Sequence, residues 1–414
     1  MARTLVAALL VAVLAPSGHA DDSCVQCHGM LPAPLGTPVE GMRTDVHAKA
    51  GLSCADCHGG DPGDTSDGAM SKAKGFVGKP SAADVPAFCG RCHADENVMR
   101  RWNPHLPTDQ LAQYRTSVHG KRLAEGDDRV ATCVSCHGVH GILPVGDARS
   151  PVHKTNVATT CARCHADAEH MKGYDIPTDQ LAKWEKSVHG ELLLVQREMA
   201  APTCNDCHGN HGAFPPGADS VAAVCGQCHV SNKDFFLASP HRPAFERLGL
   251  PECVTCHQNH LVSRTSDAML GNTPPAVCTG CHAPDSKGFA AAGRMRAAVD
   301  GLRTANEHAE ASLATAAAAG MEVSEAEFAF RAAREALVAA RTRVHTFDPA
   351  AVEKVAADGV RVARAADEAG AAALVQRARR RWMALIPLAA IGLVGVLVYG
   401  KIRALGGAGG PPAP

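Results

Sequence analysis

The cysteines constrain this chain more than any other feature, because all 18 occur in one pattern. Each pair has the form Cys-x-x-Cys, and a histidine follows directly, as in Cys24-Val25-Gln26-Cys27-His28. No cysteine of the sequence lies outside these motifs. The other eight motifs consist of Cys54, Cys57 and His58; Cys89, Cys92 and His93; Cys133, Cys136 and His137; Cys161, Cys164 and His165; Cys204, Cys207 and His208; Cys225, Cys228 and His229; Cys253, Cys256 and His257; and Cys278, Cys281 and His282.

This spacing is typical of covalent attachment of c-type haem. Two thiols three positions apart reach the two vinyl groups of one porphyrin, and the following imidazole becomes an axial ligand of the iron. Zinc ribbons and disulfides also use paired cysteines, but neither requires a histidine after every second cysteine. We therefore predict nine covalently bound haem c groups, with the motif histidines as proximal ligands.

The composition agrees with a cofactor-filled interior. Aromatic residues make up only 4% of the 414 residues, so large side chains for a core are scarce. The charge is balanced, with 41 basic against 42 acidic residues, which gives no indication of a nucleic-acid partner. We expect porphyrins to supply the missing apolar volume.

The motifs belong to an internal repeat. Pro107 to Ala112 recurs as Pro177 to Ala182, and Ser-Val-His-Gly follows at 117–120 and again at 187–190. Each repeat consists of a leading histidine, a first motif, a trailing histidine three residues beyond that motif, and a second motif. The Cys24 motif stands before the first repeat.

Over about residues 45 to 283, the chain resembles the multihaem cytochromes c built from doubled Cys-x-x-Cys-His repeats. The resemblance implies a haem-packed domain of loops and short helices that carries electrons.

The repeat also predicts distal ligands. Histidine supply nearly matches nine irons, which favours two imidazoles on most of them. Two imidazoles leave no open position on an iron, which suits electron transfer. The first repeat departs from the pattern, because Asp61 stands where a trailing histidine belongs. The predicted distal ligands are His47, His119, His140, His189, His211, His241 and His260, with His105 and His153 as further candidates; His170 and His345 stay unresolved.

Methionine is the alternative distal ligand, and it would raise the potential. Met30, Met42, Met99 and Met171 are available, and we find no repeat-wide spacing among them. Tyr114 and Trp184 precede the two Ser-Val-His-Gly segments at matching places, where we expect them to pack on a porphyrin.

Both ends of the chain predict export and anchoring. Residues 1–20 read as a signal peptide, with Arg3 before an apolar run and small residues before Asp21. A short N-terminal anchor is the alternative. Residues 382–400 are apolar and long enough to span a membrane. The flanking Arg379–Arg381 would then lie outside, against the positive-inside preference, which export of a preceding domain can override.

Between residues 287 and 381 the chain is rich in alanine, arginine and glutamate and predicts packed helices. Gly320 should end the first, Ser324 to Glu327 should cap the second, and Asp348-Pro349 should start the third. We expect the third to run on into the membrane span, with Gly359 and Gly370 as candidate interruptions.

The predicted class is mainly α with much irregular structure. A nine-haem domain (residues 21–286) precedes the helical region (287–381), one transmembrane helix (382–400) and a short tail (401–414). A haem domain followed by long helices resembles the layout of the nitrite reductase and hydroxylamine oxidoreductase superfamily. In that layout His345, at a helix end, could fold back onto a haem.

The leading functional hypothesis is an electron conduit on the periplasmic face of the bacterial cytoplasmic membrane. A membrane quinol-oxidising module would donate electrons, and periplasmic cytochromes or a terminal reductase would accept them. The second hypothesis is a reductase of nitrite, hydroxylamine or a sulfur oxyanion, which requires one open haem. The third is direct quinol oxidation by this chain. The C-terminal helices could also pair two copies of the chain.

Overall fold

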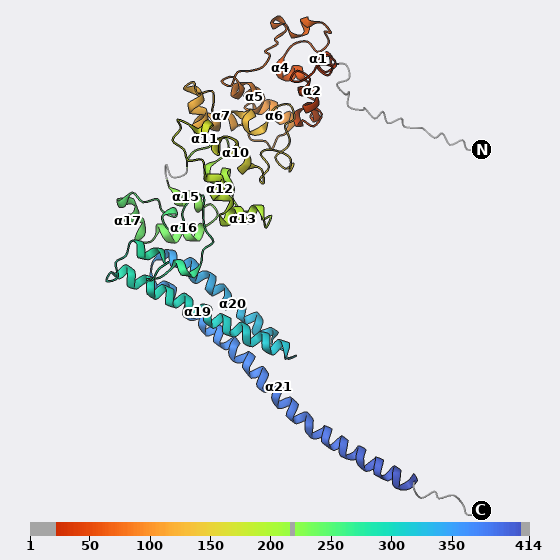
Figure 1. Cartoon of the computed structure of the whole chain (residues 1–414), viewed down its shortest axis with the longest axis vertical. Helices are drawn as coiled ribbons and strands as arrows, with labels where there is room; N and C mark the ends of the chain where they lie inside the picture. The colour runs from red at the N-terminus through yellow and green to blue at the C-terminus, as the bar shows by residue number, and fades with distance from the viewer. Residues whose placement is uncertain (1–21, 216–219, 407–414) are drawn as a thin grey trace, which may run out of the picture. The chain divides into compact units, whose positions relative to one another are not determined.

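The computed structural model describes residues 22–215 and 220–406, and within these ranges it contains helices and loops but no strand (Figure 1). This confirms the predicted mainly α class. The predicted signal peptide and the end of the predicted tail lie outside the described residues. The chain divides into two compact units: residues 22–215 with His257–Arg264 form the first, and Ser220–Cys256 with residues 265–406 form the second.

The first unit consists of short helices joined by loops. Several end at the motif histidine because the next residue is a glycine with positive φ, at Gly59 (70°), Gly138 (78°) and Gly209 (81°). The α-helices are α1 (Ser23–His28), α2 (Thr37–Met42), α3 (Val46–Lys49), α4 (Cys54–His58), α5 (Val85–His93), α6 (Glu96–Trp102), α7 (Gln110–Thr116), α8 (Val118–Ala124), α9 (Cys133–His137), α10 (Val157–His165), α11 (Ala168–Met171), α12 (Gln180–Glu185), α13 (Val188–Leu194) and α14 (Cys204–His208), and the 3₁₀-helices are η1 (Asp67–Met70) and η2 (Lys72–Lys74).

The apolar core of the first unit is small. Its cluster of buried residues contains Ala158, Trp184, Leu193 and Ala201. The other buried apolar residues, Ala69, Val85, Met99, Leu123, Val130 and Met171, lie outside this cluster, and together they supply little buried apolar area for a unit of this length. The prediction that porphyrins fill this interior accounts for the difference.

The second unit begins with short helices and continues as a three-helix bundle. The bundle helices are α19 (Lys287–Ala318), α20 (Ser324–Arg343) and α21 (Pro349–Gly406), which are long because alanine has the highest helix propensity. The shorter elements are α15 (Val221–Cys225), α16 (Val230–Leu237), α17 (His241–Leu248), α18 (Val254–His257, whose last residue belongs to the first unit), η3 (Asp267–Met269), η4 (Val277–Gly280) and η5 (Val344–Thr346).

Two clusters of buried residues hold the bundle together. One centres on Leu313 and Phe330, and the other on Val299, Leu302 and Val352. Alanines fill most of the remaining buried positions, so the helix axes approach closely.

The helix starts and ends largely follow the sequence. α19 ends before Gly320, whose φ is 76°, and α21 starts at Pro349, where Asp348 accepts a hydrogen bond from the Ala350 amide at 3.0 Å. The expected capping box at Ser324 is wrong. Val323 is the N-cap residue, and the Ser324 side chain binds the Glu322 carboxylate, because the helix starts at Ser324 itself.

Gly359 and Gly370 do not interrupt α21, so that expectation is wrong. Both lie where α21 touches a neighbouring helix. A Cβ at Gly359 would come within 2.7 Å of the Ala336 Cβ, and one at Gly370 within 2.6 Å of the Ser312 Oγ. These glycines permit close helix packing, and this gain offsets their low helix propensity.

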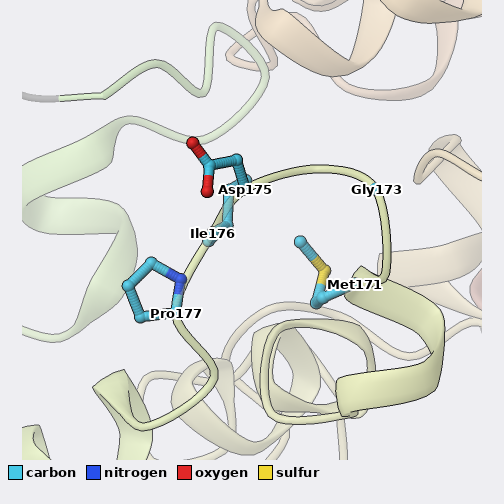
Figure 2. Close-up of a pocket in the computed structure, with 5 residues that line it drawn as sticks. All are labelled: Met171, Gly173, Asp175, Ile176 and Pro177. Carbon is cyan, nitrogen blue, oxygen red and sulfur yellow. The ribbon is translucent and has the colours of Figure 1, made fainter.

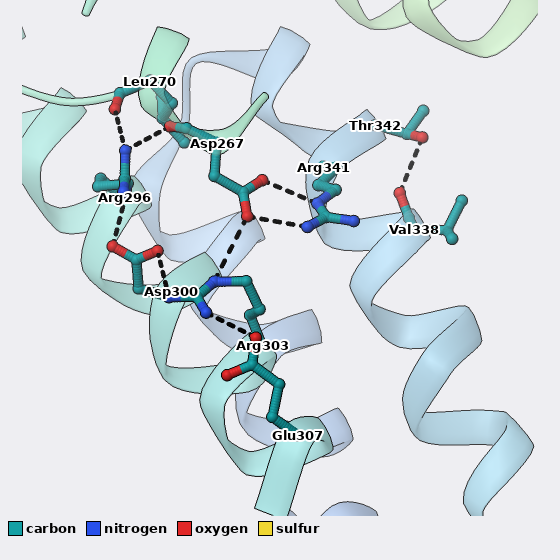
Figure 3. Close-up of polar contacts among 9 residues, drawn as sticks. All are labelled: Asp267, Leu270, Arg296, Asp300, Arg303, Glu307, Val338, Arg341 and Thr342. Atoms are coloured by element: carbon teal, nitrogen blue, oxygen red, sulfur yellow. Dashed lines mark hydrogen bonds and ion pairs between the residues drawn. The ribbon is translucent and has the colours of Figure 1, made fainter. Parts of the chain in front are cut away.

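A partly buried acidic residue at the start of η3 ties this segment to the bundle (Figure 3). Asp267 accepts two hydrogen bonds from Arg341 of α20, each 2.8 Å long, and lies 3.7 Å from Arg303 of α19. Arg296 donates to the Asp267 and Leu270 backbone carbonyls. The pKa of the Asp267 carboxyl is lowered, mainly by the hydrogen bonds from Arg341.

The C-terminal part of α21 is long and apolar enough to cross a membrane. Its most apolar stretch has a mean hydropathy of 2.2, and none of that stretch is buried in the protein. Figure 1 shows this part continuing past the ends of α19 and α20.

Candidate haem-binding sites

Six motif histidines each face a histidine from outside the motifs. The pairs are His47 with His93, His58 with His140, His119 with His165, His137 with His211, His208 with His260, and His241 with His282. Their ring centroids lie 5.9 to 6.1 Å apart. A metal ion about 2 Å from one nitrogen of each imidazole places two ring centroids about 6 Å apart. The spacing of the pairs therefore fits an iron between the two rings.

The pairs follow two rules along the chain. The second motif of a repeat faces the leading histidine of the same repeat, as in His93 with His47. The first motif faces the trailing histidine of the next repeat, as in His137 with His211. Successive repeats are therefore interlocked, since the first haem of each of the first three repeats would take one ligand from the next repeat.

The angles between ring planes follow the same division. In the first-motif pairs the planes are closer to parallel, at 31°, 10° and 6°. In the second-motif pairs they are crossed, at 79°, 57° and 77°. The two kinds of site therefore present different ligand fields to an iron.

A buried cap holds each leading histidine. Ser117 and Ser187, each 1% exposed, accept hydrogen bonds from the amides of Gly120 and Gly190 and so start the helices α8 and α13. Asp45 and Ser239 hold the amides of His47 and His241 in the same way. The Ser-Val-His-Gly segments thus begin with a helix N-cap.

The glycine of this segment is required by close packing. A Cβ at Gly120 would come within 2.0 Å of the Tyr114 carbonyl oxygen, and one at Gly190 within 2.2 Å of the Trp184 carbonyl oxygen. The preceding helix therefore crosses directly against the leading-histidine helix, and only glycine fits there.

The valine before each leading histidine makes the link to the next repeat. The amides of Val46, Val118 and Val188 donate to the carbonyls of Ile142, Ala213 and Val262, at 2.8 to 3.1 Å. Each acceptor lies two residues after a trailing histidine. These hydrogen bonds place that histidine opposite the first motif of the preceding repeat.

Asp45 strengthens the first of these links. Its carboxylate, 2% exposed, binds the amide and Nδ1 of His47 with one oxygen and the amides of Gly141 and Ile142 with the other. Burial alone would raise the pKa of Asp45, but these hydrogen bonds outweigh it and hold the pKa well below its usual range.

Imidazole orientation also suits metal binding. Nδ1 of His58 lies 2.8 Å from the Gly78 carbonyl oxygen, and Nδ1 of His208 lies 3.2 Å from that of Phe214. A ligating histidine commonly donates its second N–H to such an oxygen, which directs the other nitrogen to the metal. Burial lowers the pKa of many of these imidazoles and favours the neutral form that binds metals; the group comprises His93, His119, His137, His140, His165, His208, His211, His241 and His260.

Comparison with known proteins agrees with this arrangement. Residues 46–166 match the family model described as cytochrome c3, and residues 241–287 match the one described as doubled CXXCH motif. This chain is a multihaem cytochrome c with CXXCH repeats. It therefore binds haem c covalently through its motifs.

Two curated relatives of the cytochrome extend the match. The C-type polyheme cytochrome OmcB of Geobacter sulfurreducens is 24% identical over 63% of this chain and 28% of its own length, in strain DL-1 / KN400 and also in strain PCA. The multiheme cytochrome MtrC of Shewanella baltica is 28% identical over 34% of this chain and 21% of its own length. The cytochrome thus spans less than a third of either relative, and no solved structure matches it.

Tyr114 and Trp184 of the cytochrome have a role that the sequence did not reveal. The Tyr114 hydroxyl donates to the Ala131 carbonyl at 2.8 Å, and the Trp184 Nε1 donates to the Pro202 carbonyl at 3.3 Å. Both acceptors lie two residues before a first motif. These side chains therefore fix the motif loop against the helix that precedes the leading histidine.

Thiols of successive motifs in the cytochrome also approach one another. The cysteines of three pairs are close enough for one thiol to hydrogen-bond to the other: Cys89 with Cys133, Cys161 with Cys204, and Cys225 with Cys253. Each pair joins the second motif of one repeat to the first motif of the next. The porphyrin edges attached there would be close neighbours.

The remaining candidate ligands stand apart from these pairs. His105 is exposed and His153 binds the Thr155 hydroxyl through Nδ1 at 2.8 Å. Within residues 22–215 and 220–406, neither makes a ring contact with a motif histidine, so their roles stay predictions. His170 lies near His165 and helps to lower its pKa. His189 occupies the leading place in α13.

His345 has the features of a ligand. Its Nδ1 lies 3.0 Å from the Thr342 carbonyl oxygen, and the Asn232 amide nitrogen is 3.2 Å from the same ring nitrogen. Burial lowers the pKa of His345, and the nearby His229 lowers it further. The turn after α20 thus returns an imidazole to the haem-binding part of its own unit.

The expectation that the methionines share no spacing is wrong for two of them. Met99 and Met171, each 7% exposed, both follow a second motif, and each is the fourth residue after an aspartate N-cap, Asp95 or Asp167. The motif histidines there, His93 and His165, already face imidazoles. These methionines therefore serve as packing residues of the repeat.

A surface hollow of about 410 Å³ lies in the loop after α11 (Figure 2). Its lining contains no cysteine or histidine and consists of Met171, Gly173, Asp175, Ile176 and Pro177. It is therefore not a place where this chain ligates an iron.

Proposed function

We propose that this cytochrome is an exported nine-haem electron carrier, anchored in the membrane by α21. It passes electrons between a quinol-linked donor in the cytoplasmic membrane and acceptors on the periplasmic side. Nine haems correspond to the nine motifs. The names of the relatives, polyheme and multiheme cytochrome, suit a chain that holds several haems.

The facing imidazoles carry this proposal. An iron held between two such rings has no free position, so a substrate cannot bind to it. It can still change its oxidation state with the ligands in place. The six observed pairs therefore favour electron transfer over bond-making chemistry at these sites.

The contacts between motifs support transfer along the chain. The cysteine pairs that link one repeat to the next would bring successive porphyrin edges close together. Together with the interlocked ligands, they favour a row of haems in sequence order within each unit.

The membrane donor is proposed from the anchor. The apolar stretch of α21 is exposed and free of charge from Trp382 to Tyr399. This single span brings the cytochrome to the membrane, and a separate quinol-oxidising subunit is the proposed donor. Periplasmic cytochromes or a terminal reductase are the proposed acceptors, and the C-terminal helices are the proposed contact for pairing two copies of the chain.

The mass of the purified full-length protein tests the haem count, which should be nine per chain. A second experiment tests the carrier function. The fully reduced protein is mixed with an excess of an oxidised soluble monohaem cytochrome, and the electrons delivered per chain are counted optically. Delivery approaching one electron per haem is expected. Delivery from only one or two haems would contradict a continuous row.

A matched variant tests the anchor. The chain truncated before Trp382 should leave the membrane fraction and keep its haem content and its electron delivery to the soluble acceptor. Retention in the membrane fraction would show that another segment anchors the protein.

A further inference from the structure

The Cys24 haem falls outside both ligand rules. The Cys24 motif stands immediately before a leading histidine, His47, in the place that a second motif has before each later repeat. The Cys24 thiol also lies near Cys54 of the following first motif. Burial raises the pKa of Cys24 to about 11, and Asp22 and then Cys54 raise it further. Cys24 thus lies near the first motif that follows it, although without the thiol hydrogen bond that joins Cys89 and Cys133.

A second motif takes its partner from the leading histidine of its own repeat, and the described residues hold no histidine in that place for the Cys24 motif. The leading histidines His47, His119 and His241 are each separated from their second motif by a complete first motif. No motif precedes Cys24 in the sequence. The one histidine before it, His19, belongs to the predicted signal peptide and lies outside the described residues.

The same register explains Asp61. A trailing histidine serves the first motif of the preceding repeat, as His140 faces His58. Among the described residues before the first repeat there is no such first motif, so a histidine at position 61 would face no motif histidine there. Asp61 instead accepts hydrogen bonds from Lys74 at 3.0 Å and from the Gly63 amide at 3.0 Å. The departure at Asp61 therefore leaves no repeat haem without its ligand.

His28 itself is oriented as a proximal ligand. Its Nδ1 lies 3.1 Å from the Leu35 carbonyl oxygen, which directs the other nitrogen toward an iron. Among the residues that the structure describes, no imidazole makes a ring contact with His28, in contrast to the six paired motif histidines.

We propose that the haem attached at Cys24 and Cys27 has an open distal position and binds a small exogenous ligand. This inference rests on the haem attachment in the proposed function and adds a ligand-binding site to it. The ferrous iron at such a site takes a neutral diatomic ligand, whereas an iron closed by two imidazoles does not.

Carbon monoxide is the probe for this site. The dithionite-reduced full-length protein is titrated with carbon monoxide, and the Soret difference spectrum is followed to saturation. One molecule bound per chain is expected, together with a high-spin ferric signal equivalent to one haem in the oxidised protein. An entirely low-spin protein that binds no carbon monoxide would overturn the proposal.

Variants locate the site. The double variant Cys24→Ser, Cys27→Ser should lose one haem and all carbon monoxide binding. A His308→Ala variant, changed at an exposed position in α19, should keep one molecule per chain. Carbon monoxide binding that persists in the double variant would place the open iron elsewhere and overturn the assignment.

Substitution of the other candidate ligands distinguishes an open site from a hidden partner. His105→Ala, Met30→Ala and Met42→Ala should each leave the spin state and the carbon monoxide stoichiometry unchanged. A new high-spin haem in any of them would identify that residue as the distal ligand. Electron delivery to the soluble acceptor is measured without carbon monoxide, so failure of the carrier function is scored separately.

Discussion

The imidazole of His208 lies parallel to that of His260, with 6° between their planes and 6.0 Å between their centroids. The two residues belong to different repeats. Their contact shows that each repeat completes a site in its neighbour, and this interlocking governs the behaviour we expect from the protein.

The two kinds of ring pair should give two classes of low-spin iron. Parallel imidazole planes separate the energies of the iron d orbitals that bond to them, whereas crossed planes leave them nearly equal. Electron paramagnetic resonance of the oxidised protein should therefore show ordinary rhombic signals from the first-motif haems and signals with a much larger maximum g value from the second-motif haems. A single rhombic class would contradict the angles at His93, His165 and His282.

Removal of one trailing histidine should affect one haem in the preceding repeat. His211→Ala leaves the iron of His137 without its facing imidazole, so one haem should become high-spin and one signal of the rhombic class should disappear. The exposed His308→Ala provides the control and should change neither class. Loss of a signal from the crossed class instead would refute the register of the pairs.

The Asp45 carboxylate should contribute strongly to stability. Asp45→Asn removes the charge that holds His47, Gly141 and Ile142, and hydrogen bonds to a charged group contribute about 1.5–3 kcal/mol each. We expect a loss of at least about 2 kcal/mol in the free energy of unfolding, measured by urea titration and circular dichroism. The control is Asp95→Asn at an exposed N-cap. Aspartate and asparagine cap a helix about equally well, so this change should alter stability little.

Two glycines of the bundle should respond oppositely to alanine. At Gly359 the new methyl group meets Ala336 and Leu302 within 3 Å. Overpacking should therefore lower the free energy of unfolding by about 1–3 kcal/mol, and the higher helix propensity of alanine offsets part of this loss. At Gly301 it meets nothing within 4 Å, so Gly301→Ala should stabilise by up to about 1 kcal/mol. Urea unfolding of the chain truncated before Trp382 measures both. Equal effects would mean that α21 does not pack at Gly359.

The Asp267 ion pairs should make the bundle less stable in acid. The pKa of Asp267 is lower in the folded protein than in the unfolded chain, where it is about 3.9. Its contribution is therefore complete above that value and is lost as the pH falls through the folded pKa. Asp267→Asn should cost about 1 kcal/mol at pH 7, a small figure because Arg341 is 46% exposed to solvent.

The measurement for Asp267 is a comparison of two unfolding midpoints. The difference between wild type and Asp267→Asn should be largest at pH 7 and should shrink at pH values below about 3.9, since protonation removes the same charge. A difference that stays constant with pH would show that the substitution acts through packing alone.

Helix boundaries show how far local signals reach. Gly320 and Asp348-Pro349 act through neighbouring residues, so the sequence placed the ends of α19 and α21 correctly. The expected interruption at Gly359 was wrong because low helix propensity is a local property, whereas the contact of Gly359 with Ala336 depends on how α20 and α21 pack.

Haem attachment was determined by the sequence alone, because the two thiols and the proximal imidazole of each site lie within one short turn. The distal partner was not, since it comes from a segment whose position depends on long-range hydrogen bonds such as that from Val46 to Ile142. Only the tertiary structure placed His140 opposite His58, and it thereby explained why Asp61 needs no histidine. The physical reason is that an iron joins two ligands across space, while the sequence orders them only along the chain.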